Sequence, residues 1–138
     1  MDFFSAPTIN FNVLHVLVII EHNRRRIFHF NVTEHPTSLW AAQQMRNAFF
    51  DDNPYRYVIR DRDCKFGKYF GKKISNIDIK EILTAYRSPW QNGYVERVIG
   101  SIRREALDHF IVFNEIHLRE ILKENFYYYN KFRTHLGL

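Results

Sequence analysis

Cysteine is almost absent from this sequence of 138 residues, and so are long apolar runs. The single cysteine, Cys64, has no partner for an internal disulfide, so we expect a reducing compartment. The longest apolar run, residues 13–20, is interrupted by His15 and is much shorter than the roughly 18 residues that span a membrane. The opening residues 1–4 carry neither the basic leader nor the cleavage site of a secretory signal. These absences predict a soluble protein with no membrane partner.

Internal repeats, low-complexity tracts and glycine- or serine-rich linkers are missing too. With 46% hydrophobic and 25% charged residues, the composition excludes disordered, collagen-like and coiled-coil chains. The seven histidines include no pair at zinc-finger spacing, so we expect no zinc site. We therefore expect one globular domain over residues 1–138.

Positive charge is in excess, and the excess is local. The whole chain has a formal net charge of +5. Residues 56–73 alone hold seven basic side chains against two acidic ones. Such a segment favours a polyanionic partner such as a nucleic acid, or is a solvated face with no partner.

The pattern of apolar residues predicts three strands followed by helices that alternate with strands. The strands are expected at residues 2–4, 13–20, 26–32, 55–60 and 80–86. The helices are expected at residues 39–49, 65–76, 94–109 and 114–131, with turns at 51–54 and 87–93. The run 13–20 is typical of a strand buried on both faces, so it is expected at the centre of a sheet. This order predicts an α/β fold with a mixed sheet flanked by helices.

Three acidic residues stand where a strand ends or a helix begins: Asp2, Asp61 and Glu96. Adjacent strands with a helix packed across their ends bring such side chains to one edge of a sheet, where many α/β proteins have their active site. A carboxylate cluster suits Mg²⁺, which takes oxygen ligands, and two such ions support phosphoryl transfer. On spacing alone, the alternative that these are ordinary surface acids stays open.

The segment around Glu96 is predicted to be an amphipathic helix. Asn92, Glu96 and Arg103 fall on one row of it, because positions i, i+4 and i+11 lie close together at about 100° per residue. The row borders an apolar stripe that consists of Val95, Ile99, Ile102 and Ala106. Arg103 is therefore a candidate for holding a DNA phosphate, and the alternative is a surface pair with Glu96.

Two motifs resemble those of a known family. Residues 88–97, Ser-Pro-Trp-Gln-Asn-Gly-Tyr-Val-Glu-Arg, with Ile-Arg-Arg-Glu at 102–105, resemble the third signature of integrase-type (DDE) transposases of bacterial insertion sequences. These transposases belong to the retroviral-integrase superfamily. Residues 59–67 resemble the second motif of the family, with Asp61 in the acidic position. The 34 residues between Asp61 and Glu96 are close to the spacing in that family.

Weaker matches extend the resemblance over almost the whole chain. Asp2-Phe3-Phe4 resembles the first motif, and Tyr129-Asn130 with Arg133, His135 and Leu138 resembles the closing pattern. The resemblance implies a ribonuclease-H-like fold with a mixed five-stranded sheet flanked by helices, here with a truncated first strand. It also implies a catalytic core that uses two Mg²⁺ or Mn²⁺ ions for DNA cleavage and strand transfer, the reactions of DNA integration, recombination and transposition of a mobile element.

The resemblance implies residue roles position by position. Asp2, Asp61 and Glu96 take the places of the catalytic metal ligands. Asn92 and Arg103 take those of supporting residues at the active-site loop and the DNA. Asp63 stands where the family usually has glycine, and is the alternative second ligand. Further candidates for DNA contacts are Arg97, Arg62, Lys65 and Trp90.

The implied partners are DNA, as element ends and as target, and further copies of the chain in a homo-oligomer. The expected location is the cytoplasm, at the bacterial nucleoid when the protein is bound to DNA. The sequence starts one residue before Asp2, so we expect a chain without the upstream DNA-binding domain of the family, and this leaves an alternative. It is a catalytically inactive, truncated transposase that binds DNA or multimerises with the full-length protein. A ribonuclease H shares the fold and the metals but lacks the signature around Glu96.

Overall fold

The computed structural model describes residues 1–22, 26–49, 55–67, 70–74, 77–84 and 93–133. The chain forms two compact units. The first unit contains Met1 and residues 36–93, and the second contains residues 2–35 and 94–138. Among the described residues, no helix is both long and apolar enough to cross a membrane.

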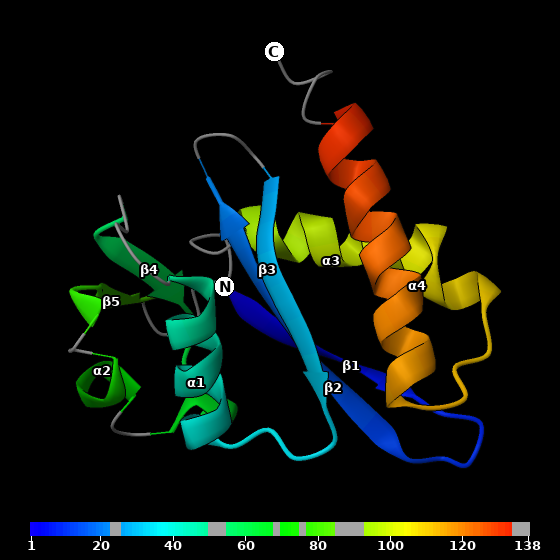
Figure 1. Ribbon diagram of the computed structural model, residues 1–138, viewed down its shortest axis with the longest axis horizontal. Helices are drawn as coiled ribbons and strands as arrows, with labels where there is room; N and C mark the ends of the chain where they lie inside the picture. Colours follow the sequence, from blue (N-terminus) through cyan, green and yellow to red (C-terminus); the bar gives the residue numbers. More distant parts are fainter. Residues whose placement is uncertain (23–25, 50–54, 68–69, 75–76, 85–92, 134–138) are drawn as a thin grey trace. The chain divides into compact units, whose positions relative to one another are not determined.

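The second unit is built on a three-stranded antiparallel sheet. It consists of β1 (Asp2–Pro7), β2 (Val13–Glu21) and β3 (Arg26–Thr33), drawn in blue to cyan in Figure 1. β2 lies between the other two strands. Its residues from Val16 onward are buried without a break, although alternate side chains point to opposite faces of a sheet. The predicted central strand, shielded on both faces, is thus confirmed.

β1 is longer than the predicted strand at residues 2–4. Its ladder with β2 begins with Asp2 opposite Val18 and continues to Pro7 opposite Val13. The apolar pattern stops at Ser5, but the backbone hydrogen bonds of an antiparallel ladder do not depend on it, so the strand extends to the turn.

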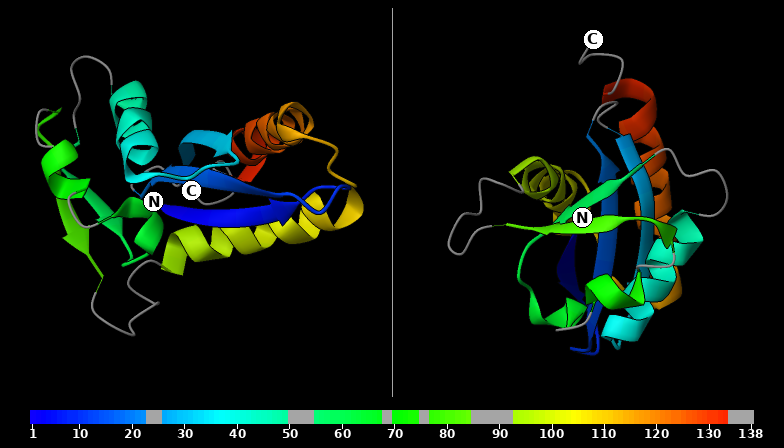
Figure 2. Two further views of the ribbon diagram at one scale, coloured as in Figure 1. Left: turned by 90° about the horizontal axis from the view of Figure 1, so that it is seen from below. Right: turned by 90° about the vertical axis from the view of Figure 1, so that its left-hand side faces the viewer.

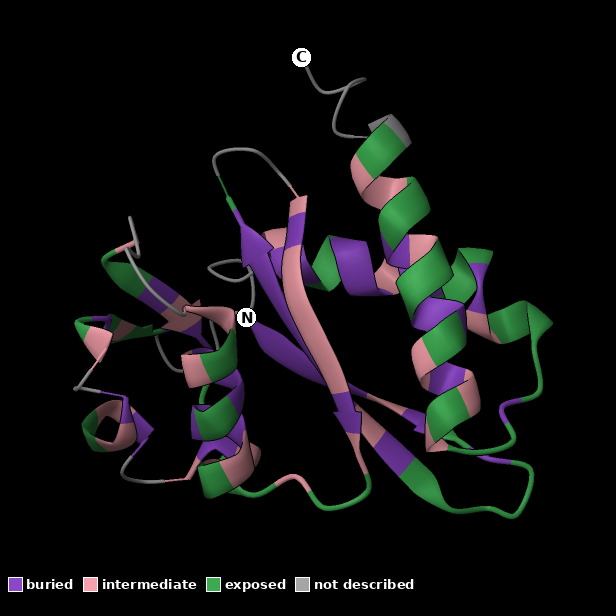
Figure 3. Cartoon of the chain, in the orientation of Figure 1, coloured by how far each residue is buried: buried purple, intermediate pink, exposed green. Residues whose placement is uncertain are grey.

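Two helices pack on one face of this sheet. They are α3 (Gly93–Glu105) and α4 (Glu115–Tyr128). Figure 2 shows α3 running along β1, and Figure 1 shows α4 alongside β3. The apolar core that they form with β2 contains Leu14, Val16, Val18, Ile20, Val95, Val98, Ile99, Ile102, Leu118, Ile121, Leu122 and Phe126. Figure 3 shows the buried β1 and β2 in purple beside the half-exposed β3.

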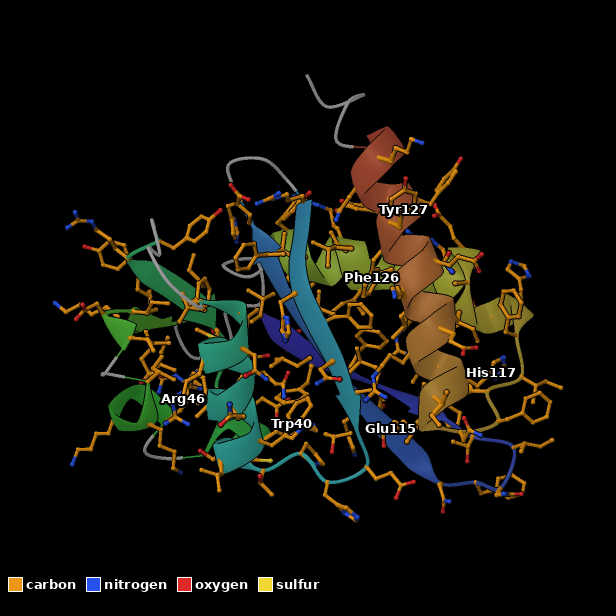
Figure 4. The ribbon with its side chains drawn as sticks, viewed as in Figure 1. Trp40, Arg46, Glu115, His117, Phe126 and Tyr127 are labelled. Carbon is orange, nitrogen blue, oxygen red and sulfur yellow. The ribbon has the colours of Figure 1, made fainter. Side chains whose placement is uncertain are left out.

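The apolar stripe predicted on the helix around Glu96 is confirmed, because Val95, Ile99, Ile102 and Ala106 are all buried. On α4, the ring of Phe126 meets that of Phe30 of β3 edge to face, with 4.7 Å between centroids (Figure 4). Such aromatic pairs add to the stabilisation that apolar burial supplies.

The first unit contains a parallel pair of strands, β4 (Tyr57–Arg60) and β5 (Lys80–Leu83). Its helices are α1 (Ser38–Ala48), the 3₁₀ helix η1 (Cys64–Phe66) and α2 (Phe70–Lys73). α1 begins after Thr37, whose side chain accepts a hydrogen bond from the N–H of Trp40 at 3.0 Å, as an N-cap does. The buried residues of this unit include Ala41, Ala42, Met45, Val58, Phe66, Phe70, Ile74 and Ile79.

The prediction of one mixed five-stranded sheet is wrong for the described residues, which form a three-stranded and a two-stranded sheet. In the first unit, β4 makes its ladder with β5, and the carbonyl oxygen of Ile59 accepts a hydrogen bond from the nitrogen of Met1 at 2.9 Å.

Two predicted helices are shorter than expected. The helix expected at 65–76 is divided into η1 and α2, because Gly67 adopts a φ of 77° and ends the first turn. α3 ends at Glu105, and residues Leu107–His109 form a separate 3₁₀ helix. The turn expected at 51–54 lies outside the described residues, as does the turn expected at 87–93 except for Gly93, which is the first residue of α3.

Candidate metal centre

Asp2 is a buried carboxylate at the start of β1, only 4% exposed. Its Oδ1 accepts a hydrogen bond from the N–H of Phe3 at 2.8 Å. Burial of a carboxylate among apolar strand residues is unfavourable unless hydrogen bonds or a cation compensate for the lost water. Asp2 is therefore not an ordinary surface acid.

Glu96 lies in the first turn of α3, within the same unit as Asp2. The neighbouring Val95 points into the core, while Glu96 itself is exposed. A carboxylate oxygen of Glu96 lies within 4.8 Å of one of Asp2. The positive end of the helix dipole stabilises an acid in this turn.

The chemistry of this donor pair fits a divalent cation. Two ionised carboxylates at this distance repel each other, and a cation bound by both removes the repulsion. Mg²⁺ and Mn²⁺ prefer oxygen ligands of this kind and complete their coordination with water and substrate phosphates. Asp2 and Glu96 are thus suited to bind such an ion.

Asp61 follows the last residue of β4 in the first unit. It is half-buried, and its Oδ1 accepts a hydrogen bond from the N–H of Asp63 at 3.2 Å. Its backbone carbonyl accepts a second bond, from Nη1 of Arg60 at 2.8 Å. Both bonds hold Asp61 in a defined conformation at the end of the strand.

Asp63, the alternative second ligand, is engaged in local structure. Its Oδ1 accepts from the N–H of Lys65 at 2.9 Å and so caps η1. The Lys65 ammonium lies 3.3 Å from Oδ2 of the same carboxylate. Both carboxylate oxygens of Asp63 are thus engaged by Lys65.

The predicted DNA-contacting residues fall into three groups. Arg97 and Arg103 are exposed on α3, where Arg103 lies over the ring of Phe4 at 5.4 Å. Arg62 is exposed after β4, whereas Lys65 is partly engaged by Asp63. The remaining two candidates, Trp90 and Asn92, lie outside the described residues.

Sequence reasoning missed the role of Arg60. This residue was counted only as part of the basic segment, yet it is buried and forms an ion pair with Glu81 of β5 at 2.8 Å. The available signal was its place inside an apolar strand pattern, where a charged residue requires a partner.

Comparisons with known proteins agree with this architecture. The integrase core domain family matches residues 77–138, a segment that includes Glu96 and Arg103. No curated protein sequence gives a significant match. In fold, the chain is similar to a chain of the simian T-cell lymphotropic virus intasome, solved in complex with PP2A regulatory subunit B56 gamma. The TM-score is 0.66 at 15% identity, over 75% of this chain and 37% of that chain.

The catalytic core domain of BIV integrase is also similar, with a TM-score of 0.53 at 16% identity, over 74% of this chain and 64% of that one. This chain thus spans less than two thirds of the length of either structure. At such identities the likeness shows the fold, an RNase-H-like α/β fold. The chain is thus similar to the integrase core domain family over residues 77–138, and its fold is similar to that of retroviral integrase catalytic cores.

Proposed function

We propose that this chain is the catalytic core of a DDE transposase of the insertion-sequence type, which cleaves DNA and transfers strands with divalent metal ions. The observation that carries the proposal is the pair of carboxylates of Asp2 and Glu96, whose oxygens lie within 4.8 Å. Glu96 belongs to the segment that matches the integrase core domain family.

In this proposal, Asp2, Asp61 and Glu96 hold the metal ions. Asp2 and Glu96 belong to the second unit, and Asp61 belongs to the first. Asp61 enters the proposal through its place in the second motif, where it holds the acidic position.

Two bound ions supply activation of the attacking oxygen and stabilisation of the leaving oxygen in an in-line displacement. The residues of the chain bind these ions and hold them in a fixed orientation. The buried Asp2 fixes one ligand on a rigid strand, and Glu96 presents another from a helix whose apolar side is anchored in the core. A rigid scaffold of this kind keeps ligands in place during the reaction.

Exposed arginines supply the DNA contacts of the proposal. Arg97 and Arg103 project from the helix that carries Glu96, and Arg62 follows Asp61 directly. Guanidinium groups bind phosphate oxygens through paired hydrogen bonds, so these side chains are suited to hold the DNA backbone beside the carboxylates. We propose element ends and target DNA as substrates, a homo-oligomer as the working form and the bacterial cytoplasm as its location.

The alternative proposal is an inactive remnant that binds DNA or multimerises with full-length transposase. The same exposed arginines serve both proposals, because DNA binding through phosphates needs no metal. The two proposals differ only in whether the carboxylates support catalysis.

Nicking of supercoiled plasmid in the presence of Mn²⁺ distinguishes them. The wild-type chain and Glu96→Gln are compared after circular dichroism has shown that both are folded. We expect nicking by the wild type and none by Glu96→Gln, because the neutral amide lacks the charge with which the carboxylate attracts a divalent cation. A folded wild type that binds DNA without nicking it overturns the catalytic proposal and supports the remnant.

A further inference from the structure

Arg60 is a buried arginine next to Asp61. It closes β4, is 5% exposed, and its Nε donates to Oε2 of Glu81 at 2.8 Å. Its guanidinium lies 5.0 Å from the ring centroid of Phe66 and 5.3 Å from that of Phe70. Its Nη1 donates to the backbone carbonyl of Asp61 at 2.8 Å. All of these partners belong to the first unit.

Stability alone does not explain a guanidinium at this position. A buried ion pair loses several kcal/mol of hydration per ion, and well-packed apolar residues often replace such pairs with no loss of stability. An apolar pair in place of Arg60 and Glu81 would leave the carbonyl of Asp61 without this donor. The bond to the neighbouring acid is therefore the contact that such a replacement cannot restore.

The position of the Glu81 carboxylate depends on a glycine in α2. A Cβ atom on Gly71 of α2 would lie 2.6 Å from Oε1 of Glu81, so the carboxylate occupies the space that the glycine leaves open. The two aromatic rings cover the guanidinium, and cation–π attraction adds to the ion pair. The orientation of Arg60 is thus fixed by β5, η1 and α2 together.

We propose that Arg60 is a positioning residue for Asp61. It holds the carbonyl of Asp61 on one side, while the N–H of Asp63 holds Oδ1 on the other. Together these bonds set the direction in which the carboxylate leaves the strand. The inference rests on the proposed role of Asp61 as a metal ligand, because it concerns how that ligand is oriented.

The test is direct Mn²⁺ binding by the 138-residue chain, measured from the loss of the EPR signal of free Mn²⁺ during titration. Arg60→Lys keeps the charge beside Glu81 but loses the planar fork that reaches both partners. We expect about a tenfold weaker Mn²⁺ affinity, the usual loss when a group that orients a metal ligand is removed. Asp61→Asn, which removes the ligand itself, serves as the reference for loss of binding.

Arg46→Lys is the matched control. Arg46, labelled in Figure 4, is half-buried in the same unit, and its Nη2 donates to the carbonyl of Lys73 at 2.9 Å. It makes the same type of bond to a carbonyl remote in sequence from Asp61. If the arginines are purely structural, both Arg60→Lys and Arg46→Lys lower the melting temperature. If Arg60 positions Asp61, the Mn²⁺ affinity falls in Arg60→Lys and not in Arg46→Lys.

Gly71→Ala tests the same mechanism without a change in Arg60 or Asp61, and serves if Arg60→Lys does not fold. The added methyl displaces the Glu81 carboxylate, and we expect a smaller loss of affinity, about threefold. If Asp61→Asn loses binding while folded Arg60→Lys and Gly71→Ala bind Mn²⁺ as the wild type does, the positioning role is overturned and the metal site stands. If Asp61→Asn binds as the wild type does, the proposed site and the role of Arg60 are overturned together.

Discussion

Asn130 forms two hydrogen bonds with the backbone of Ile27, although 103 positions separate them in the sequence. Its Oδ1 accepts from the N–H of Ile27 at 2.8 Å, and its Nδ2 donates to the carbonyl of the same residue at 3.0 Å. The amide thereby takes the place of a neighbouring strand at the start of β3, where the register with β2 is shifted. Asn130 lies in the π-helical turn Tyr129–Arg133 that follows α4, so this contact ties the end of the helix to the sheet.

We expect Asn130→Ala to lower the free energy of unfolding by about 1–3 kcal/mol. The substitution leaves a half-buried N–H and carbonyl without their partner, and unsatisfied groups of this kind have that cost. Urea unfolding measures the change. Asn125→Ala is the control, because the Asn125 amide donates to the carbonyl of Ile121 within its own helix and alanine favours helix. Equal losses in the two variants would contradict a special role for Asn130.

Replacement of Asp63 by asparagine separates the two candidates for the second metal ligand. Asparagine caps a helix as well as aspartate does, so Asp63→Asn keeps η1 while it removes the charge. We expect Asp63→Asn to nick plasmid like the wild type and Asp61→Asn to lose nicking. Plasmid assays with both variants at several Mn²⁺ concentrations provide the measurement. Loss of nicking in Asp63→Asn with activity retained in Asp61→Asn would reverse the assignment.

Gly67 is expected to tolerate no side chain. Its φ of 77° lies in the left-handed region, and an added Cβ would lie 2.8 Å from Cβ of Ser38. Gly67→Ala should therefore lower the free energy of unfolding by more than about 1 kcal/mol. For comparison, a Cβ on Gly93, the first residue of α3, meets no atom of the described residues within 4 Å. We expect Gly93→Ala to be neutral or stabilising, and a similar loss in both variants would mean that strain at Gly67 is not the cause.

The sequence predicts what depends on short-range pattern. The apolar run 13–20 predicts the central strand, and the spacing of Val95, Ile99 and Ile102 predicts the buried side of α3. Both predictions succeed because side chains repeat their direction every two residues in a strand and every 3.6 residues in a helix. The partition of the strands into two sheets was not predictable in this way, since pairing depends on backbone contacts between distant segments.

The same limit applies to the candidate site. The sequence indicates Asp2 and Glu96 by their places beside predicted strands and helices and by motif, whereas their proximity depends on how α3 packs on β1 and β2. The Arg60–Glu81 pair requires the register of β4 against β5, which no single-sequence pattern contains. The capping role of Asp63 was predictable from the sequence, because an aspartate side chain commonly accepts a hydrogen bond from the backbone N–H two residues further on.

Arg103 offers the most direct test of DNA contact. Its guanidinium lies over the ring of Phe4 of β1, two residues from Asp2. The side chain of the adjacent Arg104 folds back over its own helix, and its Nη1 lies 3.2 Å from the place that a Cβ on Gly100 would take. If Arg103 binds a phosphate, Arg103→Gln should reduce the slope of log affinity against log salt concentration by about one, and Arg104→Gln should leave it unchanged. Fluorescence anisotropy with a labelled duplex over a range of salt concentrations measures both slopes. Equal reductions would show that the two arginines act only through their overall charge. Arg103 would then not define a path of the DNA past Asp2 and Glu96.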